Sequence, residues 1–166
     1  MTFICSSLGG PYNQYQWTHL ETYNIVSNEP QLTISSVSFG NGGNYQCEVS
    51  NMAGNDIAVS SLNTPAIIVR GPENQTVNIG GDVTFSCEFK SLLAINVVWL
   101  LNNTTLSPNS DLTITTTQNT STLFLNDVSE SDVGTYTCQV DNGVSEPVSE
   151  SGQLIVGKNI QYNLIS

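Results

Sequence analysis

The chain repeats one pattern of residues, and this internal repeat constrains its fold more than any other feature. In both copies a cysteine precedes a tryptophan by twelve positions: Cys5 and Trp17, then Cys87 and Trp99. Residues 32–47 and 123–138 then share the pattern L-x-[IL]-x-x-V-x-x-x-[ND]-x-G-x-Y-x-C. The interval between the tryptophan and the second cysteine is nine residues longer in the second copy. The chain therefore contains two equivalent units, and the second one carries an insertion.

Around these landmarks, apolar and polar residues alternate with the period of two that is typical of a β-strand with one buried face. One such run places four apolar side chains on the same side: Val83, Phe85, Cys87 and Phe89. Turn-forming segments at 41–44 and 78–82 bound the short strands, and no 3.6-residue apolar pattern of useful length is present. The sequence therefore predicts an all-β protein.

The cysteines indicate the compartment. There are four of them, Cys5, Cys47, Cys87 and Cys138, and none has the close C-x-x-C spacing that zinc and dithiol sites usually need. Long-range disulfides fit the spacing better. Because disulfides persist in oxidising compartments, we expect an extracellular chain, either at a cell surface or secreted.

The charge of the chain excludes one class of partner. Three Lys and Arg residues stand against fourteen Asp and Glu residues, for a net charge of -11. No basic stripe is present to neutralise phosphates, which argues against nucleic-acid binding. The most apolar stretch, residues 92–101, is half the length that a bilayer requires. We therefore expect membrane attachment only through regions outside this chain.

The complete set of cysteine, tryptophan and D-x-G-x-Y-x-C elements resembles the immunoglobulin superfamily, and within it the intermediate-set (I-set) domains of adhesion molecules and receptor ectodomains. The resemblance covers nearly the whole chain. It implies two Greek-key β-sandwiches in tandem, whose sheets are tied together by the pairs Cys5–Cys47 and Cys87–Cys138. In this family the tryptophan packs against the disulfide, a role that falls on Trp17 and Trp99.

The resemblance also assigns a tyrosine corner to each unit. The tyrosine two residues before the second cysteine donates its hydroxyl to the backbone of the preceding turn, which implies this role for Tyr45 and Tyr136. Asp132 matches the acidic residue of that turn, whereas the first copy has Asn41 there. We expect Gly43 and Gly134 to occupy the tight bend itself.

The resemblance to the immunoglobulin superfamily also implies the domain boundaries. Residues 1–64 form an immunoglobulin-like domain that lacks its N-terminal strand, residues 65–156 form an I-set domain, and residues 157–166 are a linker or the start of a further segment. We expect a ragged sheet edge and lower stability in the first domain. Leu92 and Leu93 are apolar residues in a loop of the second domain, and we predict that they pack at the domain junction. The alternative is a loop that folds onto its own domain.

Four N-x-[ST] sequons begin at Asn74, Asn102, Asn103 and Asn119. We expect these positions to be exposed, which predicts a glycoprotein. Composition alone would produce about four sequons in a chain so rich in Asn, Ser and Thr, so their number decides nothing. We do not expect the overlapping pair, Asn102 and Asn103, to carry two glycans.

Two surfaces are candidates for partner binding. The first is the far tip of the first domain, where we expect the loops at 6–13 and 51–55 to lie together. The loop at 6–13 contains Gly9, Gly10, Pro11, Tyr12 and Asn13, residue types that are common in recognition loops. The second is a sheet face of the second domain, where Val98 and Leu100 point away from the core. An ordinary polar loop and two isolated apolar side chains are the plainer interpretations.

Enzymatic interpretations lack the necessary groups. The single histidine, His19, has no nucleophile or orienting group near it in the sequence, so packing or surface exposure is the simpler role. No glycine-rich phosphate loop opens a helix. The acidic residues Asp127, Glu130 and Asp132 lie in one turn, where turn capping is a stronger interpretation than calcium binding. We therefore expect no enzyme, no cofactor, no metal and no small-molecule substrate.

These observations predict an extracellular protein-binding module of a cell-surface recognition or adhesion receptor, with a homophilic or heterophilic protein partner. Two alternatives remain open. One is a structural immunoglobulin repeat in a secreted matrix or array protein. The other is the ligand-binding ectodomain of a receptor kinase or phosphatase.

Overall fold

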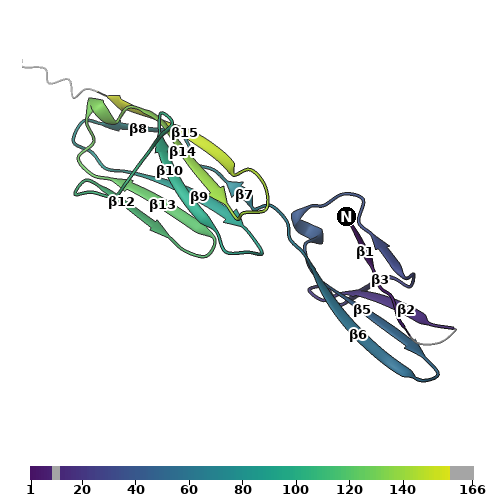
Figure 1. Ribbon diagram of the computed structural model, residues 1–166. Coiled ribbons are helices and arrows are strands. Elements are labelled where there is room, and N and C mark those ends of the chain that lie inside the picture. Colours follow the sequence, from purple (N-terminus) through teal and green to yellow (C-terminus); the bar gives the residue numbers. More distant parts are fainter. Residues whose placement is uncertain (9–11, 158–166) are drawn as a thin grey trace, which may run out of the picture. The chain divides into compact units, whose positions relative to one another are not determined.

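The computed structural model describes residues 1–8 and 12–157, and the chain divides into two compact units, Met1–Pro65 and Ala66–Ser166 (Figure 1). Both units are built from β-strands, so the all-β prediction is confirmed. The described residues contain two short 3-10 turns, η1 (Phe39–Asn41) and η2 (Glu130–Asp132), one in each unit. Each turn directly precedes the strand that carries the second cysteine of its unit.

The first unit consists of a four-stranded sheet in the order β3-β2-β5-β6 and a two-stranded sheet of β1 and β4. The strands are β1 (Thr2–Ile4), β2 (Gln14–His19), β3 (Asn24–Ser27), β4 (Gln31–Thr33), β5 (Gly43–Asn51) and β6 (Gly54–Leu62). Among the described residues β1 pairs with β4 alone. The long hairpin of β5 and β6 pairs from Gly43 with Leu62 to Asn51 with Gly54.

The second unit has a five-stranded sheet in the order β11-β10-β14-β15-β8 and a four-stranded sheet in the order β12-β13-β9-β7. Its strands are β7 (Ile67–Arg70), β8 (Gln75–Asn78), β9 (Val83–Lys90), β10 (Asn96–Leu101), β11 (Thr104–Thr105), β12 (Leu112–Thr116), β13 (Thr120–Leu125), β14 (Gly134–Asp141) and β15 (Val148–Gly157). Between the tryptophan and the second cysteine the first unit has two strands, β3 and β4, and the second unit has three, so the predicted insertion adds β12.

The consecutive strands β7 and β8 belong to different sheets of the second unit. β7 pairs with β9 in one sheet, and β8 pairs in parallel with β15 in the other. The crossing between them passes close to Gly152, where an added Cβ would lie 2.6 Å from the carbonyl oxygen of Glu73. A glycine at this position therefore allows the crossing strand to approach β15.

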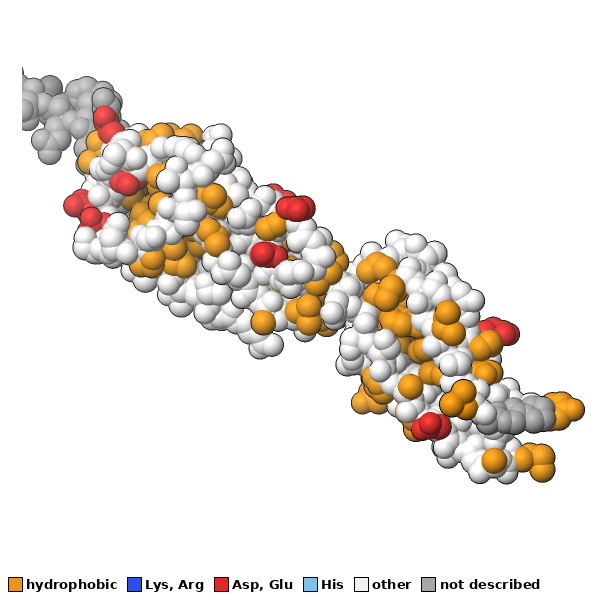
Figure 2. Space-filling model, in the orientation of Figure 1, with side chains coloured by type: hydrophobic (Ala, Val, Ile, Leu, Met, Phe, Trp, Pro, Cys, Tyr) orange, Lys and Arg blue, Asp and Glu red, His pale blue; other side chains and the backbone are white. Residues whose placement is uncertain are grey.

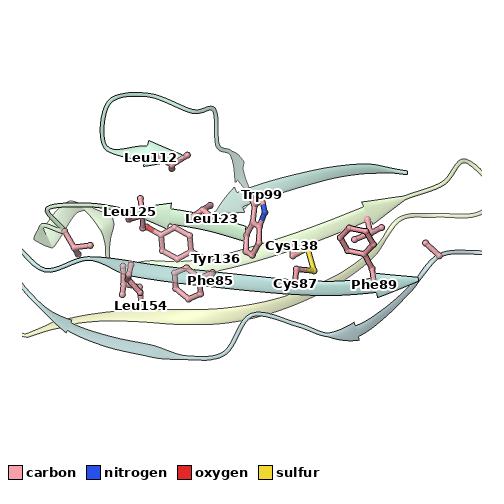
Figure 3. Packing of buried hydrophobic residues seen from close by; sticks show 14 residues of the cluster. Phe85, Cys87, Phe89, Trp99, Leu112, Leu123, Leu125, Tyr136, Cys138 and Leu154 are labelled. Carbon is pink, nitrogen blue, oxygen red and sulfur yellow. A yellow bond between two sulfur atoms is a disulfide. The ribbon is translucent and has the colours of Figure 1, made fainter. Parts of the chain in front are cut away.

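The core of the second unit follows the alternation that the sequence predicted. In β9, Val83, Phe85, Cys87 and Phe89 are buried and the residues between them are exposed. Phe85 stacks on Tyr136 with ring centroids 4.7 Å apart, and Figure 3 shows Trp99 beside the Cys87–Cys138 disulfide. Because Trp99 donates its indole N–H to the buried Ser121 hydroxyl at 2.9 Å, its polar atom is satisfied within the core.

The core of the first unit is smaller. Its buried residues are Phe3, Cys5, Trp17, Leu32, Tyr45, Cys47, Val49 and Leu62. Phe3 is the centre of an aromatic group, with its ring centroid 6.0 Å from that of Trp17 and 5.5 Å from that of Tyr45. Each fully buried side chain of this kind contributes about 1.5–3 kcal/mol, so a core with fewer members supplies less stabilisation.

A disulfide joins Cys5 to Cys47 in the first unit and Cys87 to Cys138 in the second, each with a Cα–Cα distance of 6.4 Å. Each bridge connects the two sheets of its unit, because its cysteines lie on strands, or at the end of a strand, in different sheets. Both bridges enclose long loops, and such loops are the ones whose closure most restricts an unfolded chain.

Candidate protein-binding surfaces and the turns that support them

The turn before the second cysteine is braced in the same way in both units. The Tyr45 hydroxyl donates a hydrogen bond to the Asn41 carbonyl at 2.6 Å, and the Tyr136 hydroxyl donates one to the Asp132 carbonyl at 2.8 Å. Burial, and then the charge of Asp132, raise the pKa of Tyr136 to about 12. The pKa of Tyr45 is also raised, mainly by burial and secondly by the charge of Glu21.

The side chain at the turn position caps the backbone, whether it is an asparagine or an aspartate. Asn41 Oδ1 accepts a hydrogen bond from the Ser38 N–H at 2.8 Å, and Asp132 Oδ2 accepts one from the Ser129 N–H at 2.8 Å. Because the capping contact needs an acceptor oxygen and not a full charge, Asn41 replaces the acid without changing the turn. Asp132 therefore acts as a turn cap.

A second side-chain hydrogen bond, here called a brace, spans the bend at each of Gly43 and Gly134. The sequence did not indicate it. In the first unit both Glu21 carboxylate oxygens accept from the Asn44 N–H, at 2.8 and 2.9 Å. In the second unit Asn102 Oδ1 accepts from the Thr135 N–H at 2.9 Å. Glu21 lies four residues after its tryptophan, whereas Asn102 lies three residues after its own. Since both the residue type and the spacing differ, the internal repeat carries no signal for this pair.

His19 is a buried structural residue. Its Nδ1 lies 3.0 Å from the Thr22 hydroxyl, and its Nε2 lies 3.0 Å from the Gly42 carbonyl oxygen. Its ring centroid lies 4.7 Å from that of Tyr45. The imidazole thus packs under the bend of the first unit.

The tip of the first unit, at the end that carries the β5–β6 turn, exposes large apolar side chains. Leu8 and Met52 are fully exposed and Tyr12 is almost so. Asn51 at the end of β5 donates its side-chain amide to Asn13 Oδ1 at 2.9 Å, which joins the loop before β2 to the β5–β6 turn. Several hydrophobic side chains are visible on the face of this unit that Figure 2 shows. The predicted contact residues Gly9, Gly10 and Pro11 lie outside the described residues.

A polar hollow of about 510 Å³ lies next to this tip. Its lining residues are Asn13, Gln14, Tyr15, Gln16, Asn28, Glu48 and Ser50. It is open to solvent and lined mainly by amide and hydroxyl groups. These groups can donate and accept hydrogen bonds, which suits contact with a polar loop of a protein.

The second predicted surface is less prominent. Val98 and Leu100 on β10 are half-buried and alternate with Val97 and Leu101, which pack against the core. The alternation places Val98 and Leu100 on the outer face of the five-stranded sheet, where Val98 is opposite Gln139 of β14 and Leu100 is opposite Thr137. Two half-buried side chains among polar neighbours do not form an apolar patch.

The four sequon asparagines are in different structural settings. Asn74 Oδ1 accepts the Gln153 N–H at 2.8 Å, and Asn102 accepts the Thr135 N–H. Asn103 is exposed in the β10–β11 turn with a φ of 68°. Asn119 is exposed in the β12–β13 turn, where its carbonyl accepts the Phe89 N–H at 2.9 Å. Their glycosylation stays a prediction.

Leu92 and Leu93 lie in the turn between β9 and β10 and are partly exposed. Their predicted role at a domain junction stays a prediction.

Within residues 1–8 and 12–157, no group of three or more His, Cys, Asp or Glu side chains is placed to hold a metal ion. The described part of the chain also has no helix with the length and apolar character needed to cross a membrane.

Two disulfide-bridged β-sandwiches with tyrosine corners define a tandem of immunoglobulin-like domains. The family model of the immunoglobulin I-set domain matches residues 66–156, and a second immunoglobulin domain model matches residues 1–51. Because the I-set match covers more than half of the chain, the protein belongs to the immunoglobulin superfamily as an I-set member, which confirms the family resemblance.

The chain is similar to curated proteins of the same superfamily. It is 28% identical to human Roundabout homolog 2 over 93% of the chain and 13% of that protein. It is 31% identical to Roundabout homolog 3 of Homo sapiens over 73% of the chain and 9% of that protein, and 31% identical to Protein turtle of Drosophila melanogaster over 81% and 9%. The chain thus spans about a tenth of the length of these relatives.

Solved structures share the fold. A three-domain I-band fragment of titin superimposes with a TM-score of 0.62 and 23% identity, covering 95% of the chain and 60% of the titin fragment. The N-terminal Ig1-2 module of the Drosophila receptor protein tyrosine phosphatase DLAR has a TM-score of 0.55 and 29% identity, covering 58% of the chain and 50% of that module. The family and these relatives place the chain among immunoglobulin-superfamily domains of the kind found in adhesion receptors, and such domains are not themselves enzymes.

Proposed function

We propose that the two units are an extracellular protein-binding segment of a cell-surface recognition or adhesion receptor, and that the tip of the first unit contacts the partner. The observation that carries this proposal is the exposure of Leu8, Tyr12 and Met52 at one end of that unit. Large apolar and aromatic side chains that a folded unit leaves in water are typical of contact surfaces.

The polar hollow beside the tip supports the same proposal. It supplies hydrogen-bonding groups at the border of an apolar contact, and this combination resembles the apolar centre and polar rim of protein interfaces. Residues 1–65 contain no Lys or Arg and four acidic residues, so a basic partner surface would be attracted to this unit.

The relatives and the disulfides support the extracellular location. Roundabout and Turtle proteins are cell-surface receptors, and disulfides persist in oxidising compartments. The similarity to a receptor phosphatase module favours a second candidate, the ligand-binding ectodomain of a receptor with a catalytic domain elsewhere in its chain.

Binding to an array of purified receptor ectodomains tests the proposal. The whole chain, presented as a bivalent fusion, is expected to bind at least one ectodomain. The triple variant Leu8→Ser, Tyr12→Ser, Met52→Ser is expected to bind at least about tenfold more weakly, as in the loss of interface anchors. Val144→Ser, in a turn of the second unit, is the matched control and keeps the affinity. Unchanged binding by the triple variant would exclude the tip as the contact.

A further inference from the structure

Two asparagine–glycine pairs have the same dipeptide sequence but different surroundings in the fold. They are Asn41–Gly42, in the turn before β5, and Asn142–Gly143, in the turn between β14 and β15. In such a pair the glycine nitrogen can attack the side-chain carbonyl of the asparagine, because glycine has no side chain to obstruct the approach. Since both pairs share this property, the fold decides which of them reacts.

In the β14–β15 turn, a carboxylate holds the proton that this attack must remove. The Gly143 N–H donates a hydrogen bond to Asp141 Oδ1 at 2.8 Å. This distance is within the reach of a general base. Asp141 is therefore placed to accept the proton of the attacking nitrogen directly.

The carbonyl group that is attacked also has a hydrogen-bond donor. Asn142 Oδ1 accepts the Val144 N–H at 3.4 Å. An N–H group directed at this oxygen stabilises the negative charge that develops on it as the nitrogen adds to the carbonyl carbon. A base, a carbonyl and a nucleophile are thus held together within one turn, which removes most of the entropic cost of bringing them together.

The turn also leaves room for the reaction. Gly143 is exposed and has a φ of 73°. Apart from its chain neighbours, no atom of the described residues lies within 4 Å of the position that a Cβ on Gly143 would take. A ring can therefore form at this position, and water can reach it.

The Asn41–Gly42 pair lacks these features. The Asn41 amide is held on both sides, because its Oδ1 accepts the Ser38 N–H at 2.8 Å and its Nδ2 donates to the Ser36 carbonyl at 2.6 Å. Gly42 is buried, and its N–H donates to the Phe39 carbonyl at 3.3 Å. A neutral carbonyl oxygen is a much weaker base than a carboxylate, so the first pair is protected.

We propose that Asn142 is a site of spontaneous deamidation, in which the Gly143 nitrogen displaces the side-chain amide. The nitrogen bonds to the Asn142 side-chain carbonyl carbon and loses its proton to the Asp141 carboxylate. The amide group takes up that proton and leaves as ammonia, which closes a succinimide and regenerates the carboxylate. Water then opens the ring at either carbonyl and leaves aspartate or isoaspartate at position 142.

The modification changes a contact between two turns of the second unit. Asn142 Nδ2 donates to the Ser91 hydroxyl at 3.0 Å, which links the β14–β15 turn to the β9–β10 turn. Deamidation removes this donor and places a second carboxylate next to Asp141. The link is therefore weakened, and this end of the unit becomes more acidic. The site lies in the second unit and does not depend on the partner contact proposed for the first.

Peptide mapping by mass spectrometry after incubation of the folded, disulfide-bonded chain at neutral pH tests this assignment. Asn142 is expected to deamidate at least about tenfold faster than Asn41. Asp141→Asn keeps the acceptor oxygen but removes the base, and it is expected to slow the reaction of Asn142 at least about tenfold. Glu146→Gln, which removes a carboxylate from the same turn, is the matched control and leaves the rate unchanged. Circular dichroism verifies that each variant is folded.

The chain reduced and unfolded in urea separates the effect of the fold from that of the sequence. The two rates are expected to converge there, because the contacts that protect Asn41 are lost. A folded chain in which Asn142 reacts no faster than Asn41 overturns the proposal, as does an undiminished advantage of Asn142 in urea. An unchanged rate in Asp141→Asn, or an equal slowing by Glu146→Gln, also overturns it.

Discussion

The side-chain oxygen of Asn102 lies 2.9 Å from the backbone nitrogen of Thr135 and accepts its hydrogen bond. The Asn102 amide also lies against Gly134, where an added Cβ would come within 2.6 Å of it. Asn102 and the neighbouring Asn103 are both exposed, and their sequons overlap. Of the two, Asn102 has its side-chain amide held by Thr135 and packed against Gly134, so a sugar on its Nδ2 has to compete with these contacts.

We therefore expect that a glycan in the β10–β11 turn is carried by Asn103 and not by Asn102. Glycopeptide mass spectrometry of the chain secreted from animal cells measures this. Asn102→Gln leaves the occupancy of Asn103 intact, because the sequon Asn103-Thr104-Thr105 does not include residue 102. A glycan found on Asn102 in the unmodified protein would contradict the expectation.

Gly43→Ala is expected to destabilise the first unit by about 1–3 kcal/mol. Gly43 has a φ of 126°, and an added Cβ would lie 2.4 Å from the Glu21 carboxyl carbon. The variant therefore strains the backbone and displaces the Glu21 brace. Urea unfolding followed by Trp17 fluorescence measures the change. Gly40→Ala has no atom within 4 Å of its added Cβ and serves as the control with little expected change.

The stability of the second unit is expected to fall as the pH rises from 10 to 12. The pKa of Tyr136 is raised from 10.0 to about 12 in the folded state, so the folded unit retains a proton that the unfolded chain releases. The stabilisation is therefore fully present below pH 10 and is lost as the pH approaches 12. Urea unfolding at several pH values measures the slope.

Tyr136→Phe is the variant that isolates this effect. It removes the hydrogen bond to Asp132 and is expected to cost about 1 kcal/mol at neutral pH. It should also flatten the decline above pH 10, because the titrating hydroxyl is gone. A decline of the same steepness in Tyr136→Phe would assign the pH dependence to another group.

The Cys5–Cys47 disulfide is expected to be reduced before Cys87–Cys138. Cys5 is 9% exposed, and an open hollow of about 280 Å³ reaches both cysteines of this bridge, whereas Cys87 and Cys138 are fully buried. A thiolate reductant must reach a sulfur atom to attack it. Limited reduction with dithiothreitol, followed by alkylation and peptide mapping, determines the order. First labelling of Cys87 and Cys138 would contradict the exposure argument.

The sandwich fold could be predicted because its signals are local or repeated. The alternation of Val83, Phe85, Cys87 and Phe89 is visible within seven residues, and the first cysteine precedes the tryptophan by the same interval in both units. Two copies of one pattern make the interpretation independent of any single residue. Asn41 illustrates this, since its departure from aspartate left the turn recognisable and the capping contact unchanged.

The candidate surfaces were less predictable because exposure depends on neighbours that are distant in the chain. Tyr12 and Asn13 were predicted at the tip, but the exposed Leu8 and Met52 were not singled out. Met52 lies in a hairpin turn that an amide contact from Asn51 holds beside the loop of Asn13, 38 residues away. The composition of the two loops does not predict this contact.

By itself the sequence determined that this protein is all-β, that it has two immunoglobulin units, and that Val83, Phe85, Cys87 and Phe89 share one buried face. These properties follow from hydrophobic periodicity and from a pattern repeated along one chain. Only the tertiary structure showed the Glu21 and Asn102 braces. Each depends on which backbone groups remain unpaired after the sheets have formed, and hydrogen-bond partners more than twenty residues apart leave no regular spacing in the sequence.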